Sequence, residues 1–265
     1  MKKSLSITLI IIVAFMLMNI LGKRLISEVL AEEFQFLGLA LLRVSMLVFT
    51  LWLLFTDELV QWKYLFKNNL FFTSLSIGLI AISIYKVSNR IVIEDRIITN
   101  FRHYSYFAQC LSVGFFEEFF SRVFVFTRIC YHLKYSSSKN TFSYVAISSI
   151  IFGFLHLTNL LNPSYDVLSV FTQIVFAIMI GFVFHTLLLT FKNIIFLGVL
   201  HALFNYFGML KTKLFQVVSI DDESATIAFR DSMISLLLIG VIIIPICYFK
   251  IRKNQNLLYG TNDSN

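Results

Sequence analysis

The stretch VLSVFTQIVFAIMIGFVFHTLLLTF, Val167–Phe191, contains no charged residue. About 20 apolar residues in a helix cross the hydrocarbon core of a bilayer, which is roughly 30 Å thick. Lipid offers no hydrogen-bond partners, so the backbone of such a segment must satisfy its own donors and acceptors, as a helix does. This stretch therefore predicts a transmembrane helix.

Similar apolar segments recur along the whole chain, which is 58% hydrophobic and 14% charged, with a mean hydropathy of +0.80. Soluble domains are less apolar, at about 45–50%. We predict an all-α fold, a polytopic membrane helix bundle with about eight transmembrane helices, in a single integral-membrane domain over residues 1–265. The predicted spans are Leu5–Gly22, Phe34–Thr56, Leu70–Val87, Tyr104–Tyr131, Phe142–Leu161, Val167–Phe191, Asn193–Leu210 and Ser232–Phe249.

The formal net charge of the chain is +7. In a soluble protein this excess of lysine and arginine would suggest nucleic-acid binding. Here the basic residues lie at the edges of the apolar segments, where the anionic headgroups of lipids attract them. We therefore expect the lipid bilayer to be the partner of these charges, and no nucleic acid.

The fourth predicted span carries three charged residues within the stretch FFEEFFSRVF, Phe115–Phe124. A charge at the centre of a membrane helix costs about 2.5–3.5 kcal/mol on insertion scales. Glu118 and Arg122 are four residues apart and share a helical face, so they can form an ion pair that serves helix positioning alone. Glu117 is rotated by about 100° from Glu118, and Ser121, four residues further on, cannot neutralise it. An unpaired carboxylate inside a membrane indicates a functional site.

Two later spans add polar residues to this glutamate. His156 lies in the apolar stretch SSIIFGFLHLTN, and His201 and Asn205 are four residues apart on one face of the seventh span. Each histidine alone is more often a packing residue than a catalyst, and His185 in the sixth span is predicted to be one. Together, Glu117 and these three residues supply a base, an orienting group and an oxyanion donor, the groups that amide hydrolysis needs.

These residues form three motifs in chain order: E-E-x-x-x-R from Glu117 to Arg122, F-x-x-x-H from Phe152 to His156, and H-x-x-x-N from His201 to Asn205. In order and spacing they resemble the CAAX-protease and bacteriocin-processing (CPBP) intramembrane proteases, the Abi or Rce1-like family. The resemblance covers residues 104–208, which we expect to be the catalytic core. The family usually has an aromatic residue before the motif arginine and a glycine after it, where this chain has Ser121 and Val123.

The resemblance implies that the chain is an intramembrane endopeptidase. Glu117, assisted by His156, is expected to take a proton from a water molecule that attacks the scissile carbonyl. His201 and Asn205 are expected to stabilise the resulting oxyanion. The expected substrate is a membrane-embedded or prenylated peptide or protein. The expected location is the cell membrane, as a multi-pass protein of a bacterial plasma membrane, with a role in peptide maturation or bacteriocin self-immunity.

Other readings of the same residues stay open. Glu117, His156 and His201 match a catalytic zinc site with water at the fourth position, so the cofactor is undecided between zinc and none, and we prefer the metal-free mechanism. In the metal-free mechanism, Glu118 and Arg122 are expected to hold the helix. The chain can also be a non-catalytic membrane scaffold or immunity protein that binds a partner. A transporter is disfavoured because no inverted repeat is apparent.

Overall fold

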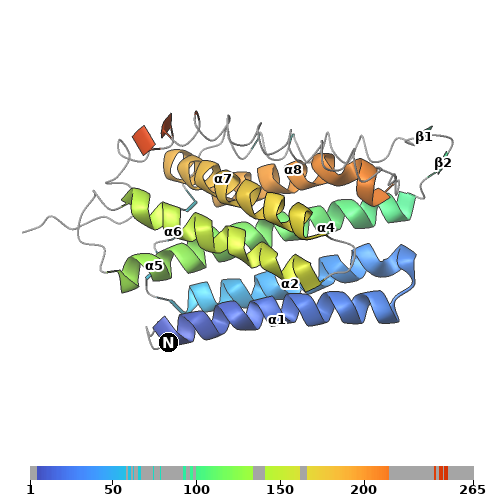
Figure 1. The fold of residues 1–265 in the computed structure, drawn as a ribbon, viewed down its shortest axis with the longest axis horizontal. Coiled ribbons are helices and arrows are strands. Elements are labelled where there is room, and N and C mark those ends of the chain that lie inside the picture. The colour runs from blue at the N-terminus through green and yellow to red at the C-terminus, as the bar shows by residue number, and fades with distance from the viewer. Residues whose placement is uncertain are drawn as a thin grey trace, which may run out of the picture.

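The computed structural model describes residues 5–57, 100–133, 141–161 and 166–207, the backbone of 208–214, and scattered positions between 59 and 97 and between 242 and 249. Figure 1 shows the helices side by side, with their axes roughly along the longest dimension of the molecule. The predicted third and eighth spans, Leu70–Val87 and Ser232–Phe249, lie almost entirely outside the described residues.

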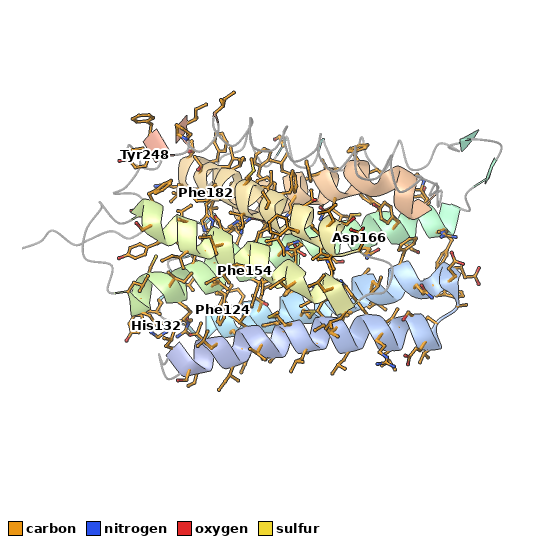
Figure 2. All side chains as sticks on the ribbon, in the orientation of Figure 1. Phe124, His132, Phe154, Asp166, Phe182 and Tyr248 are labelled. Atoms are coloured by element: carbon orange, nitrogen blue, oxygen red, sulfur yellow. The ribbon has the colours of Figure 1, made fainter. Side chains whose placement is uncertain are left out.

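The first two helices form a hairpin, α1 (Leu5–Val29) and α2 (Glu32–Phe55). Glu32 and Glu33 occupy the first turn of α2, where negative charge is favoured by the helix dipole. The aromatic ring of Phe15 attaches α1 to the interior, with its centroid 4.7 Å from that of Phe120. The start of α1 lies near the end of α5 (Phe126–His132), where Thr8 Oγ1 is 3.4 Å from His132 Nε2 (Figure 2).

The predicted fourth span is a continuous helical segment whose middle is not an α-helix. It consists of α4 (Asn100–Glu118), the π-helix η2 (Phe119–Val125) and α5. All seven residues of η2 are buried. π-Helical hydrogen bonds run from i to i+5 and are frequent at functional sites. The π-helix begins directly after Glu117 and Glu118, so the simple α-helical spacing assumed from the sequence does not hold beyond Glu118.

The predicted fifth span also changes its helix type. It consists of α6 (Thr141–Phe154) followed by the 3₁₀ helix η4 (Leu155–Leu161). His156 lies in this apolar helical segment as expected, in its 3₁₀ part. The tighter 3₁₀ winding turns the side chains after Phe154 to directions that an α-helix would not give them.

The predicted sixth span is confirmed at both ends by α7 (Val167–Phe191). Asp166 caps its first turn by accepting a hydrogen bond from Ser169 N at 2.8 Å. Lys192 ends it with a left-handed backbone, φ 53°. Asn193 then starts α8 (Ile194–Leu214), since its Oδ1 accepts a hydrogen bond from Phe196 N at 2.9 Å.

Helices α4 and α8 approach each other very closely. A Cβ atom added to Gly114 on α4 would lie 2.6 Å from the carbonyl oxygen of Gly198 on α8. Only glycine permits this backbone contact. The contact brings the end of α4, with its two glutamates, beside the face of α8 that carries His201.

Four helical segments are long and apolar enough to cross a membrane, by length and composition: α1, α2, Thr141–Leu161 and α7. The shorter apolar stretch Ile194–Phe207 belongs to α8. The chain is thus a helical, multi-pass membrane protein, and the predicted count of about eight spans is not confirmed in the described residues. The strands found there, Val92–Ile93 (β1) and Arg96–Ile97 (β2), form one short antiparallel pair.

Candidate active site

Glu118 is fully buried, with 0% of its side chain exposed. Its Oε2 lies 3.4 Å from Arg122 Nε, which confirms the ion pair predicted from their spacing. Its Oε1 lies 2.8 Å from Nδ1 of His201 on α8. Glu118 therefore joins the first and third motifs, a contact that the sequence did not predict.

Glu117 faces the other nitrogen of the same imidazole ring. Its Oε2 lies 3.7 Å from His201 Nε2, and 19% of its side chain is exposed. Two adjacent glutamates thus approach opposite nitrogens of His201 from one helix end. Glu117 is the partly accessible carboxylate of the two, so it is the one that a water molecule can reach.

Hydroxyl groups stabilise the π-helical turn that follows the glutamates. Ser121 Oγ donates to the carbonyl oxygen of Glu117 and also accepts from Arg122 Nη1 at 2.8 Å. Ser148 on α6 donates its hydroxyl to the carbonyl oxygen of Ser121 at 3.2 Å. Carbonyl groups that a π-helix leaves without their α-helical partners are satisfied in this way. Ser121 stands where the family usually has an aromatic residue, and here it has this backbone role.

The ring of His156 is oriented by the backbone of its own motif. Its Nδ1 lies 3.1 Å from the carbonyl oxygen of Phe152. A carbonyl oxygen only accepts, so Nδ1 carries the proton and the neutral ring has its lone pair on Nε2. His156 interacts electrostatically with both Glu117 and His201. The structure therefore brings the three predicted residues Glu117, His156 and His201 into one cluster.

Phe152, the aromatic residue of the second motif, contacts all three motifs. Its ring lies 4.4 Å from the guanidinium carbon of Arg122, a cation–π contact. The ring centroid is 5.2 Å from that of His156 and 6.4 Å from that of His201, with both rings edge-on. A phenylalanine at this position thus packs the motifs together in a dry interior.

Asn205 follows His201 by one turn of α8 and is half-buried. Its backbone carbonyl accepts a hydrogen bond from the Tyr106 hydroxyl at 3.3 Å. Within the described part of the chain, its side-chain amide has no hydrogen-bonding partner. The structure places Asn205 on the His201 side of α8 without tying its amide to another residue.

His185 was predicted to be a packing residue, and it is buried on α7 with its ring 4.8 Å from that of Phe126. Its ring nitrogens have no hydrogen-bond partner in the described residues. It shows no contact with Glu117 there. Its burial agrees with a packing role, and it also interacts electrostatically with Arg122.

Two basic residues near the cluster were missed by the sequence analysis. Glu117 interacts electrostatically with Arg43 of α2 and Lys23 of α1, in addition to the two histidines. The first span was predicted to end at Gly22, which was wrong because α1 continues to Val29 and includes Lys23. Arg43 lies in the middle of a predicted span, a signal that should have marked it as a functional candidate.

The described side chains do not form a metal site. Among residues 5–57, 100–133, 141–161 and 166–207, no group of three or more His, Cys, Asp and Glu residues is arranged to hold a metal ion. Both ring nitrogens of His201 face carboxylates, and Nδ1 of His156 faces a carbonyl. In this arrangement Glu117, His156 and His201 are not grouped as the ligands of a tetrahedral zinc site.

Fold and site together define the class: a helical multi-pass membrane protein with a Glu, His and Arg cluster in its interior. Residues 100–207 match the family described as "Type II CAAX prenyl endopeptidase Rce1-like". The match confirms the predicted resemblance of this region to the Rce1-like family, and the family implies a protease. The matched region holds all three motifs, whereas α1 and α2 lie outside it. No curated protein and no solved structure matches the chain.

Proposed function

We propose that the protein is an intramembrane endopeptidase that hydrolyses a peptide bond with water activated by Glu117. The observation that carries this proposal is the placement of Glu117 and Glu118 against one histidine. Glu118 is fully buried and bonded to His201, while Glu117 stays partly exposed at 3.7 Å from His201 Nε2. One carboxylate orients the ring and the other is available for chemistry.

The proposed first step is removal of a proton from water. Glu117 takes the proton, and the hydroxide adds to the scissile carbonyl carbon, so that the C=O double bond becomes a tetrahedral C–O⁻. His156, with its lone pair on Nε2, assists by accepting a hydrogen bond from the same water. The tetrahedral intermediate then collapses, the C–N bond breaks, and Glu117 returns its proton to the leaving amine.

The negative oxygen of the intermediate needs hydrogen-bond donors. Asn205 supplies an amide NH₂ from the turn after His201, and its lack of another partner in the described residues leaves it available for this role. Nε2 of His201 lies on the Glu117 side of the cluster, so an N–H on that nitrogen would be a second donor to the oxyanion. Donors aimed at developing charge in a dry site give large rate effects.

Glu118 and Arg122 have a supporting role in this proposal. Their ion pair and the Glu118–His201 contact hold α4, η2 and α8 in register. Arg122 is also held by Ser121 and by the ring of Phe152. This double support suits a residue that keeps the site rigid.

The proposed substrate is a membrane-embedded or prenylated peptide or protein. The family name supports this substrate class, because it describes a CAAX prenyl endopeptidase. A site among membrane helices also favours a lipid-dissolved substrate over a soluble one. We extend the proposal to a bacterial plasma membrane, and to peptide maturation or bacteriocin self-immunity as the process served.

A comparison of the membrane peptides in cells with active and inactivated protein tests this function. Membrane peptides from cells that express wild-type protein or Glu117→Gln are compared by mass spectrometry, with equal membrane accumulation as the condition. We expect at least one peptide to be shortened only with the wild type. Unchanged peptide profiles, together with a partner retained equally by both proteins, would instead identify a non-catalytic scaffold.

A further inference from the structure

Arg43 carries a positive charge into the interior from a helix outside the matched region. It lies in the middle of α2 and is only 8% exposed. Its guanidinium carbon is 5.3 Å from the centroid of the Phe116 ring, and Phe116 directly precedes Glu117. Helix α2 packs along α4. Arg43 thus sits across a helix interface from the first motif.

Two buried arginines face the paired glutamates. Arg122 lies 3.4 Å from Glu118 within its own helical segment and also interacts electrostatically with Glu117. An arginine stays protonated in proteins, so Arg43 also needs a negative charge near it. In the described part of the chain, Glu117 is the acidic group that interacts with Arg43, although the two make no direct ion pair there.

We propose that Arg43 is a positioning residue for Glu117, whose charge compensates the Glu117 carboxylate across the α2–α4 interface and holds it toward His201. The catalytic part of this inference rests on the proposed function. It extends the site beyond residues 100–207, because a residue of the N-terminal hairpin then takes part in its electrostatics. Arg43 and Glu117 make no direct ion pair, so the oxygens of Glu117 stay available to water. A direct bidentate pair with Arg43 would occupy both of these oxygens.

A double-mutant cycle on thermal stability tests the compensation without any substrate. The variants are Arg43→Met, Glu117→Gln and the double variant, purified in detergent. Methionine keeps an unbranched apolar chain against Phe116 but removes the charge. We expect Arg43→Met to lower the melting temperature and the added Glu117→Gln to recover part of the loss. Additive effects of the two substitutions would overturn the proposal, since residues that do not interact add independently.

Kinetics of the same variants test the positioning role. We expect Arg43→Met to lower kcat by about tenfold or more, with KM changed less than about twofold. Arg43→Lys should recover part of kcat because it restores a positive charge. If Arg43→Lys is no better than Arg43→Met, Arg43 acts through packing and the proposal fails.

Arg128 provides the matched control. It is another buried arginine, and its Nη2 lies 2.7 Å from Asp57 Oδ2. Arg128→Met should lower the melting temperature without changing kcat of the folded fraction, and an equal loss of kcat would overturn the inference. Should wild type and Glu117→Gln be equally inactive on every peptide, the proposed function fails, whereas the thermal cycle still decides the role of Arg43.

Discussion

The Nδ1 atom of His201 lies 2.8 Å from Oε1 of Glu118, although the two residues are on different helices and 83 positions apart. Glu118 simultaneously contacts Arg122. A fully buried carboxylate therefore fixes the histidine whose other nitrogen faces Glu117. This arrangement explains why two adjacent glutamates occupy the interior: one supports the ring and the other is accessible.

Glu118→Ala should be the most destabilising single change in the site. It leaves the Arg122 charge without its carboxylate in a dry interior, and breaking a buried pair from one side costs about 3–5 kcal/mol. The melting temperature in detergent measures the effect. Glu117→Ala is the comparison, since its partly exposed side chain should cost less. Equal losses for both glutamates would argue against the supporting role of Glu118.

Phe152→Leu should impair the site by loosening its three motifs. The substitution removes the cation–π contact with Arg122, which is worth about 0.5–2 kcal/mol, and the edge-on contacts with both histidine rings. We expect lower melting temperature and lower kcat. Phe154→Leu is the control on the same helix, and Figure 2 labels this residue. The Phe154 side chain is 51% exposed. The interpretation fails if the two leucine variants behave alike.

Gly114→Ala should separate α4 from α8. The new Cβ would lie 2.6 Å from the Gly198 carbonyl oxygen. Such overpacking lowers the free energy of unfolding by about 1–3 kcal/mol. Separation of the helices moves His201 away from both glutamates. We therefore expect a large loss of kcat together with a small decrease in melting temperature. Gly78→Ala is the control, since no described atom lies within 4 Å of the added Cβ. Wild-type activity in Gly114→Ala would show that the close approach is dispensable.

Asp166→Ala should weaken the start of α7 by about 1 kcal/mol, the usual effect of losing an N-cap. Hydrogen bonds from the Ser169 hydroxyl and backbone N–H hold the pKa of Asp166 below its ordinary value. The contribution of Asp166 is therefore present above the ordinary carboxyl pKa and disappears as pH falls through the lowered one. Melting curves of wild type and Asp166→Ala at neutral and strongly acidic pH should converge at the acidic end. A constant difference would contradict this linkage.

Apolar patterns in the sequence predicted helix bounds best for segments without charged residues. Val167–Phe191 has the same bounds in the prediction and in the structure, because a charge-free segment has one way to satisfy its backbone in lipid. Helix α1 runs beyond its predicted end at Gly22. Its continuation is stabilised by polar contacts, Lys23 Nζ with Asn159 Oδ1 at 3.4 Å and Arg24 with Glu28 at 2.8 Å, which a search for apolar residues cannot detect.

The sequence predicted only those contacts of the site that join residues of one helix. The Glu118–Arg122 pair follows from four-residue spacing. The Glu118–His201 contact and the approach of Arg43 to Glu117 connect different helices, and their geometry depends on how those helices pack. The π-helix after Glu118 and the 3₁₀ helix around His156 are departures from α-helical geometry that the spacing of apolar residues does not reveal.

Hydrolysis of a membrane peptide in ¹⁸O-labelled water tests the central claim most directly. Purified wild-type protein in lipid vesicles, incubated with a peptide identified from the cell comparison, should release a fragment whose new carboxylate contains ¹⁸O. Glu117→Gln, assayed on its folded fraction, should lower the rate by about 10²–10⁴-fold, the range for loss of a general base. Labelled product formed at the wild-type rate by Glu117→Gln would contradict the account.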